Sequence, residues 1–186
     1  MRLIAGRLGG RELKTVTGEG YRPAMGKTRE ALFSMLEARG LVWTGARALD
    51  LFAGSGSLAF EALSRGAAQA LLVEQAPQAV RCLKANINSL NLAEQAFLVA
   101  DDVLHVLRRP PQQQYNLVFM DPPYRKNLAE PALELLLRNG WLAPEAFVTA
   151  EIEKETRFCP PQSLQPLATR QFGQTSIYIW SYIPMT

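Results

Sequence analysis

The residues best suited to chemistry are Asp121-Pro122-Pro123-Tyr124, which follow the apolar run of residues 117–120. Each proline fixes its φ at about −65° and lacks an N–H donor, and the residue before each proline is pushed towards extended geometry. The segment therefore offers two acceptors, the Asp121 carboxylate and the Pro122 carbonyl, beside the flat ring of Tyr124. Such a site suits a planar group with an NH2, and a nucleobase amine is the obvious candidate. Four residues alone fit equally well a strand-to-loop turn that ends in a surface tyrosine.

The second chemical feature is a glycine loop. Gly54, Gly56 and Ala59 satisfy the loose G-x-G-x-x-A dinucleotide fingerprint, and Glu74 lies where a ribose-binding acid is expected. A nicotinamide or flavin enzyme is therefore one interpretation. Asp50 argues against it, because a carboxylate just before the glycine turn would repel a pyrophosphate. It suits a cofactor with a cationic amino-acid end and no phosphate, and S-adenosylmethionine has that character.

Acidic residues end each of the first four predicted strands. Asp50, Glu74 and Asp121 end three of them, and Asp101 and Asp102 follow the other. Clustered carboxylates at one edge of a sheet repel one another, so they are hard to explain structurally. Glu74 could accept hydrogen bonds from the ribose hydroxyls of S-adenosylmethionine. Asp101 or Asp102 could accept one from its adenine amine.

Strand and helix patterns alternate along most of the chain. Apolar runs predict strands at residues 48–52, 70–74, 97–99, 117–121 and 147–152. Helices are predicted at residues 28–39, 58–64, 77–90, 103–107 and 128–137. This alternation predicts an α/β, Rossmann-like fold, in which helices cover both faces of a mostly parallel sheet and ligands bind at the carboxyl ends of its strands. Residues 164–172 and 175–182 predict a C-terminal antiparallel hairpin that turns at Gly173-Gln174.

The composition is that of one globular domain. The 186 residues are 48% hydrophobic and 20% charged, and no apolar stretch approaches the roughly 20 residues of a membrane helix. The N-terminus lacks the apolar core of a signal peptide, so we expect a cytoplasmic protein without a membrane partner. Cys82 and Cys159 have no metal-type spacing and His105 is the sole histidine, so we expect no metal site and no Ser-His triad.

Positive charge is concentrated at the N-terminus. Residues 1–29 hold seven basic and two acidic side chains, a net charge of +5, whereas residues 30–186 carry −2. We therefore divide the chain into a basic, turn-rich arm, residues 1–27, and a main domain, residues 28–186. The arm suggests a polyanion partner, although scattered basic residues also fit a merely solvated tail.

Several further segments carry a resemblance to a known family. They are Arg2-Leu3-Ile4-Ala5-Gly6, Arg22-Pro23, Arg29-Glu30-Ala31-Leu32-Phe33, Glu61-Ala62-Leu63-Ser64-Arg65-Gly66-Ala67, Val73-Glu74 and Gly173-Gln174-Thr175. With the glycine loop and the Asp-Pro-Pro-Tyr segment, they make nearly the whole chain similar to the bacterial 16S ribosomal RNA guanine-N2 methyltransferases of the guanine-966 type. Ala24 and Gly26 depart from the family, which usually has Thr and Asp there.

The resemblance implies a role for each group of residues. The chain would transfer a methyl group from S-adenosylmethionine to the N2 amine of a guanine in 16S rRNA, within a partly assembled small ribosomal subunit. The implied catalytic residues are Asp121, Pro122, Pro123 and Tyr124. The implied cofactor-binding residues are Asp50, Phe52, Ala53, Gly54, Ser55, Gly56, Glu74, Asp102 and Asp121, with Asp102 favoured over Asp101 for adenine. The implied RNA-binding residues are Arg2, Arg7, Arg11, Lys14, Arg22 and Arg29.

The implied mechanism is direct methyl transfer to the amine. Asp121 and the Pro122 carbonyl would accept the two N–H groups and aim the nitrogen lone pair, while Tyr124 stacks on the extruded base. A larger residue at Gly56 would fill space that the cofactor needs. Three alternatives stay open: an adenine-N6 methyltransferase acting on DNA or RNA, a nicotinamide oxidoreductase, and a non-catalytic RNA-binding assembly factor.

Overall fold

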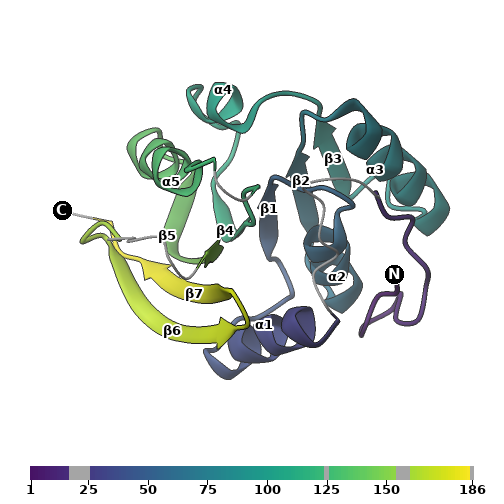
Figure 1. Ribbon diagram of the computed structural model, residues 1–186, viewed down its shortest axis with the longest axis horizontal. Coiled ribbons are helices and arrows are strands. Elements are labelled where there is room, and N and C mark those ends of the chain that lie inside the picture. Colours follow the sequence, from purple (N-terminus) through teal and green to yellow (C-terminus); the bar gives the residue numbers. More distant parts are fainter. Residues whose placement is uncertain (17–25, 124–125, 154–159, 185–186) are drawn as a thin grey trace.

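The strands of the protein form a single sheet (Figure 1) in the computed structural model, which describes residues 1–16, 26–123, 126–153 and 160–184. The strands are β1 (Arg47–Leu51), β2 (Gln69–Val73), β3 (Ala96–Val99), β4 (Tyr115–Met120), β5 (Leu142–Glu153), β6 (Leu164–Phe172) and β7 (Thr175–Tyr182). The helices are α1 (Gly26–Ala38), α2 (Ser57–Arg65), α3 (Pro77–Leu90), α4 (Val103–Leu107) and α5 (Ala129–Arg138). Each predicted strand and helix has its counterpart among these elements.

The strand order is β3-β2-β1-β4-β5-β7-β6. The pairs β3–β2, β2–β1, β1–β4 and β4–β5 are parallel, whereas β7 is antiparallel to both β5 and β6. This confirms the predicted mostly parallel sheet with a C-terminal antiparallel hairpin. The order reverses between β1 and β4, and open α/β sheets bind ligands at the carboxyl ends of the strands beside such a reversal.

Helices cover both faces of the sheet and create two apolar cores. On one face α1, α2 and α3 contribute Phe33, Phe60 and Leu83 to an apolar core that also contains Phe119 of β4. On the other face α4 and α5 pack against alternate residues of the same strands, such as Val118. Successive side chains of a strand point to opposite faces, so the near-continuous apolar runs of β1 and β4 serve both cores.

The strand β5 begins at Leu142, earlier than the predicted start at residue 147. Pro144 and Glu145 interrupt the apolar pattern, and Glu145 adopts a positive φ of 60°. The register between β4 and β5 shifts at this point, which is the signature of a bulge. Because a bulge interrupts the alternation of apolar and polar residues, a prediction from that alternation starts the strand only after the bulge.

The N-terminal arm packs on α2 and α3. Leu3 and Leu13 are buried and belong to the same apolar core as Phe60 and Leu83 of those helices. The carboxylate of Glu61 accepts hydrogen bonds from the backbone N–H groups of Ile4 (2.7 Å) and Ala5 (3.0 Å). The interpretation as a merely solvated tail is therefore wrong for residues 1–16.

Gly6 allows the closest approach between the arm and α2. A Cβ atom at this position would lie 1.9 Å from the carbonyl oxygen of Ser64, and its φ is +81°. The same carbonyl accepts the backbone N–H of Arg7 (2.8 Å), and the Ser64 hydroxyl accepts that of Leu8 (3.0 Å). Only glycine fits this contact, because any side chain would collide with backbone.

Within the described residues, no helix has the length and apolar character needed to cross a membrane. The same part of the chain has no group of three or more His, Cys, Asp or Glu side chains that could hold a metal ion.

Candidate active site

Four carboxylates gather where the neighbouring strands β2, β1, β4 and β5 end. Asp50 is the penultimate residue of β1, Glu74 follows β2, Asp121 follows β4, and Glu151 lies near the end of β5. Because side chains alternate along a strand, all four belong to the face covered by α1, α2 and α3. The strand order thus arranges them in a row across the reversal point, in the sequence Glu74, Asp50, Asp121, Glu151. We call these four residues the acid row.

Burial and mutual repulsion raise the pKa values of two members of the acid row. Burial is the largest cause for Asp121, and the charges of Glu151 and Asp50 add to it, so its pKa rises to about 8. Burial is also the largest cause for Asp50, whose pKa rises to about 7 with a contribution from Glu74. The backbone N–H of Ala59 donates to Asp50 (3.1 Å) and only partly offsets the shift. A cation bound here would lower both pKa values and would itself be stabilised.

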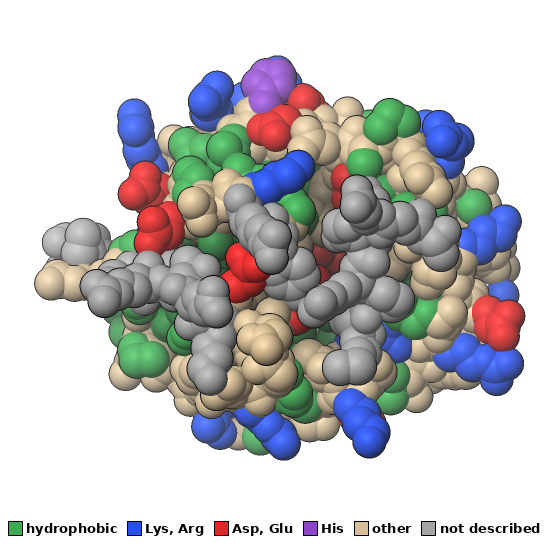
Figure 2. Space-filling model, in the orientation of Figure 1, with side chains coloured by type: hydrophobic (Ala, Val, Ile, Leu, Met, Phe, Trp, Pro, Cys, Tyr) green, Lys and Arg blue, Asp and Glu red, His purple; other side chains and the backbone are tan. Residues whose placement is uncertain are grey.

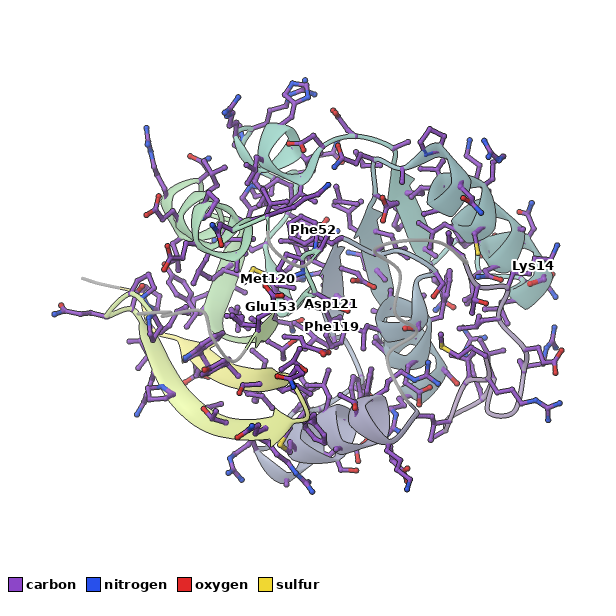
Figure 3. The ribbon with its side chains drawn as sticks, in the orientation of Figure 1. Lys14, Phe52, Phe119, Met120, Asp121 and Glu153 are labelled. Carbon is purple, nitrogen blue, oxygen red and sulfur yellow. The ribbon has the colours of Figure 1, made fainter. Side chains whose placement is uncertain are left out.

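A small cavity lies beside Asp121. It is lined by Thr28, Arg29, Leu32, Leu58, Met120, Asp121, Thr149, Ala150, Glu151 and Ile177. Figure 3 shows Asp121 beside Met120 and Phe52, where β4 and β1 end. The apolar part of the lining keeps the local dielectric low, so hydrogen bonds to the carboxylates of Asp121 and Glu151 are stronger here than in water.

The predicted catalytic segment is described only in part. Pro122 and Pro123 continue from Asp121 as partly buried, non-helical residues at the end of β4. Tyr124 lies outside the described residues, so its stacking role stays a prediction.

The glycine loop between β1 and α2 turns through three left-handed residues. These are Phe52 (φ 63°), Gly54 (φ 56°) and Gly56 (φ 78°). A bulky aromatic residue rarely adopts a positive φ, and such strain is typical of functional sites. The backbone N–H of Ala53 donates to the Val73 carbonyl (3.0 Å), which ties the start of the loop to β2.

Gly56 serves the packing of α2. A Cβ atom here would lie 2.4 Å from the Phe60 ring and 2.7 Å from a methyl of Leu83, inside the core. The expectation that a larger residue at Gly56 would fill the space of the cofactor is therefore wrong, because it would disrupt the core beneath the loop.

Glu74 is a nearly buried carboxylate beside the glycine loop. It is 7% exposed, and its two carboxylate oxygens accept the backbone N–H groups of Gly54 (2.9 Å) and Ala76 (2.8 Å). A carboxylate has about four acceptor sites, so each oxygen retains a lone pair for another donor. The glycine loop and Glu74 therefore fit a ribose with adjacent hydroxyls.

Asn86 of α3, which the sequence analysis did not single out, joins the arm to the glycine loop. Its fully buried side-chain amide donates to the carbonyls of Ser55 (3.1 Å) and Lys14 (3.0 Å) and accepts the Lys14 backbone N–H (2.9 Å). Figure 3 shows Lys14 next to α3. The predicted cofactor-binding Ser55 and the predicted RNA-binding Lys14 are thus held by one side chain.

Asp101 and Asp102 have different partners after β3. The Asp101 carboxylate contacts the His105 ring (2.9 Å), and this contact holds the pKa of Asp101 below its usual range. Asp102 caps α4 by accepting the His105 backbone N–H at Oδ1 (3.0 Å). His105, to which the sequence analysis gave no role, therefore orients both acids.

Four of the six predicted RNA-binding side chains are exposed on the arm. They are Arg2, Arg7, Arg11 and Lys14. The guanidinium of Arg2 pairs with Glu12 (2.9 Å), and that of Arg11 donates to the Ser89 carbonyl (2.8 Å). Arg22 lies outside the described residues. Figure 2 shows Lys and Arg side chains mainly around the rim of the face that it draws, with acidic side chains both at the rim and in the middle.

The prediction that Arg29 contacts RNA phosphates is wrong for this structure. Arg29 is 2% exposed, and its guanidinium donates to the Arg2 carbonyl and approaches the sulfur of Met1. Burial lowers its pKa, which the nearby Glu61 partly offsets. Its Nε has no hydrogen-bond partner in the described part of the chain. Arg29 therefore ties the arm to α1 from within the protein.

Glu151 and Thr175 are site residues that the sequence reasoning missed. The Thr175 hydroxyl donates to Glu151 Oε1 (2.8 Å), across the antiparallel pair of β5 and β7. The resemblance did include Gly173-Gln174-Thr175, but no local pattern places that turn beside Asp121.

The strand order and the relatives and solved structure that follow show the fold of a class I methyltransferase, whose methyl donor is S-adenosylmethionine. A family model described as "Conserved hypothetical protein 95" matches residues 1–181, and the chain belongs to this family. It is 37% identical over 182 residues to "Ribosomal RNA small subunit methyltransferase D" of Haemophilus influenzae, covering 97% of this chain and 93% of that protein. The protein of the same name from Escherichia coli K12 is 40% identical over 155 residues, covering 83% and 76%.

Solved structures agree with these relatives. A structure from Escherichia coli that is named a methyltransferase aligns with a TM-score of 0.88 at 34% identity, covering 100% of this chain and 99% of that one. The agreement in both fold and sequence confirms the family resemblance noted from the sequence.

Proposed function

We propose that this protein transfers a methyl group from S-adenosylmethionine to the exocyclic N2 amine of a guanine in 16S rRNA. The observation that carries the proposal is the acid row, because it offers carboxylates to a cationic donor on one side of Asp121 and to an amine on the other. The names of the relatives support ribosomal RNA as the substrate class. We further propose that the substrate is a partly assembled small subunit in the cytoplasm.

The cofactor side of the site consists of the glycine loop, Asp50 and Glu74. S-adenosylmethionine supplies an electrophilic methyl group on its sulfonium. Glu74 accepts the ribose hydroxyls, and the negative potential of Asp50 and Asp121 favours a cationic amino-acid end. The same potential disfavours a pyrophosphate, which argues against a nicotinamide cofactor. Asp102 uses Oδ1 for the cap and offers Oδ2 to the adenine amine.

The target side of the site consists of Asp121, the Pro122 carbonyl and Tyr124. The two acceptors hold the N–H groups of the amine and aim its lone pair, and such positioning supplies up to about 7–11 kcal/mol in ideal intramolecular geometry. The Asp121 carboxylate stabilises positive charge that develops on the nitrogen. A raised pKa also suits Asp121 to accept the proton that the methylated amine releases. Tyr124 stacks on the extruded base.

The arm supplies the RNA-binding surface. Arg2, Arg7, Arg11 and Lys14 are exposed, and we extend the surface to Arg22 by its position in the sequence. These side chains contact phosphates, which position an RNA without reading its sequence.

The proposal is tested by tritiated methyl transfer to small-subunit particles from cells that lack a methyltransferase of this family. We expect label in N2-methylguanosine at one nucleotide. Label in N6-methyladenosine would favour the adenine alternative. Tight RNA binding with no transfer would favour the assembly factor, and binding of NAD in place of S-adenosylhomocysteine would favour the oxidoreductase.

A further inference from the structure

Glu151 lies in the same cavity as Asp121, on the side away from the cofactor loop. The glycine loop follows β1, Glu74 follows β2, and both lie on one side of Asp121 in the strand order. Glu151 belongs to β5, the neighbour of β4 on the opposite side. If the methyl donor lies over β1 and β2, the body of the target base lies over β4 and β5. Glu151 is then the carboxylate nearest the base.

Thr175 fixes the orientation of the Glu151 carboxylate. Its hydroxyl lies 2.8 Å from Oε1 and 3.2 Å from the Phe172 carbonyl oxygen, and Thr175 itself is 5% exposed in the pairing of β5 with β7. Among the described residues Oε2 of Glu151 has no hydrogen-bond donor, although the side chain lines the cavity. The cavity therefore holds one carboxylate oxygen that is positioned but unused.

Two acids that share a cavity repel each other unless donors lie between them, and Arg29, which also lines this cavity, directs its guanidinium to the Arg2 carbonyl and the Met1 sulfur. The charge of Glu151 is among the causes that raise the pKa of Asp121. Two N–H donors on one rigid ligand would satisfy both carboxylates and remove this repulsion. Guanine has such a pair on one edge, N1–H and the N2 amine. Adenine has its amine next to an unprotonated N1, which a carboxylate would repel.

We propose that Glu151 Oε2 accepts the N1–H of the target guanine while Asp121 accepts the N2 amine. Glu151 is thereby the residue that selects guanine over a purine without a proton on N1. This inference rests on the proposed function and adds a specificity-determining residue to it. Leu32, Leu58 and Ile177 add apolar side chains to the lining from α1, α2 and β7.

The test compares two bases at the nucleotide that the wild-type protein methylates, mapped beforehand in small-subunit particles. Reconstituted particles carry either guanine or 2-aminopurine there. Both bases have the C2 amine, but 2-aminopurine has an unprotonated N1. We expect the wild-type protein to prefer guanine by about 10- to 100-fold in kcat/KM, the range of one well-placed base contact.

The decisive variant is Glu151→Gln. With its amide oxygen on the Thr175 hydroxyl, as Oε1 is in the wild-type protein, the amide N–H2 faces the base; in either amide orientation the carboxylate charge that favours a donor at N1 is lost. An amide N–H2 that faces the base cannot bond to the guanine N1–H, which is also a donor, but it can donate to the N1 of 2-aminopurine. The preference for guanine should therefore fall by at least about tenfold or reverse. Affinity for S-adenosylhomocysteine should not change. Glu145→Gln, an exposed glutamate at the other end of β5, is the matched control and should keep the wild-type preference.

A second variant guards against loss of folding. Thr175→Val keeps Glu151 but releases its carboxylate, and we expect a smaller loss of preference than in Glu151→Gln. Wild-type preference in a folded Glu151→Gln protein would overturn the inference and show that Glu151 only anchors β7. If Glu151→Gln does not fold, wild-type preference in Thr175→Val would overturn it. A wild-type protein that labels no guanine N2 would instead overturn the proposed function, so the two failures are distinguishable.

Discussion

Two buried carboxylate sites in this protein differ in how many partners they have. Glu61 of α2 is fully buried and accepts three hydrogen bonds, from the backbone of Ile4 and Ala5 and from the Arg65 guanidinium (3.0 Å). Asp50 is almost as buried but has one such partner, the Ala59 backbone, and repulsive neighbours. A buried carboxylate with enough hydrogen-bond donors stabilises the fold. A buried carboxylate that lacks them destabilises the ligand-free protein and can be stabilised by a ligand that supplies donors or positive charge.

The largest expected effect is on stability, when the hydrogen-bonded carboxylate of Glu61 is removed. Glu61→Ala removes three hydrogen bonds and leaves the partly buried N–H groups of Ile4 and Ala5 without an acceptor, while Arg65 keeps its ion pair with Glu37 (2.7 Å). The free energy of unfolding should therefore fall by about 2–4 kcal/mol. Chemical denaturation measures this loss. Glu134→Ala, an exposed change on α5, should alter stability by less than about 0.5 kcal/mol. An unchanged free energy of unfolding in Glu61→Ala would contradict the proposed stabilising role of Glu61.

The next effect is on turnover. Asp121→Asn keeps an oxygen acceptor but loses the charge that stabilises the developing ammonium, so kcat should fall by about 10²–10³-fold. The affinity for S-adenosylhomocysteine, measured by calorimetry, should change far less. Equal losses in turnover and cofactor affinity would place Asp121 in the cofactor pocket instead.

The third expected effect is a pH-dependent change in stability at Asp50. The folded pKa of Asp50, about 7, exceeds the ordinary value of 3.8, so its deprotonation destabilises the folded state as pH rises between these values. Asp50→Asn should therefore stabilise the cofactor-free protein by about 1–4 kcal/mol at pH 8 and by much less at pH 5. Thermal unfolding at both pH values measures the difference.

The same variant should bind the cofactor more weakly. Loss of the negative charge should lower the affinity for S-adenosylmethionine by about tenfold at pH 8. If Asp50→Asn gained stability but kept its affinity for S-adenosylmethionine, the shortage of hydrogen-bond donors at Asp50 would have no role in cofactor binding.

The smallest effect is expected on the arm. Replacing Arg7 and Arg11 with Glu should weaken RNA binding, and each lost phosphate contact should flatten the dependence of log affinity on log salt by about 0.7–0.9. The matched control is the same reversal at Arg108 and Arg138, two exposed residues at α4 and α5 on the other face of the sheet. Identical salt slopes in the two variants would mean that RNA binds elsewhere.

The sequence predicted the alternation of elements and the acids that end β1, β2 and β4. The bounds of α3 are those expected, because Pro77 opens the helix and Asn91 closes it in a left-handed conformation. Such signals lie within a few residues of the element that they define, so they can be read without tertiary contacts.

The features that the sequence missed depend on contacts between distant segments. Glu151 meets Thr175 only through the register of β5 with β7, which the strand pattern does not reveal. Arg29 was predicted to face phosphates, but its burial depends on the arm folding back over α1. The direction in which a Cβ at Gly56 would point likewise depends on how α2 and α3 pack.

The docking of the arm has a consequence for the order in which the chain can fold. Residues 1–16 are synthesised before the groups that hold them, Glu61, Ser64, Asn86 and Gln95, which come far later in the chain. These contacts cannot form until α2 and α3 have been made, and closing such long loops slows folding. Residues 1–16 therefore reach their final position only after much of the later chain has been synthesised.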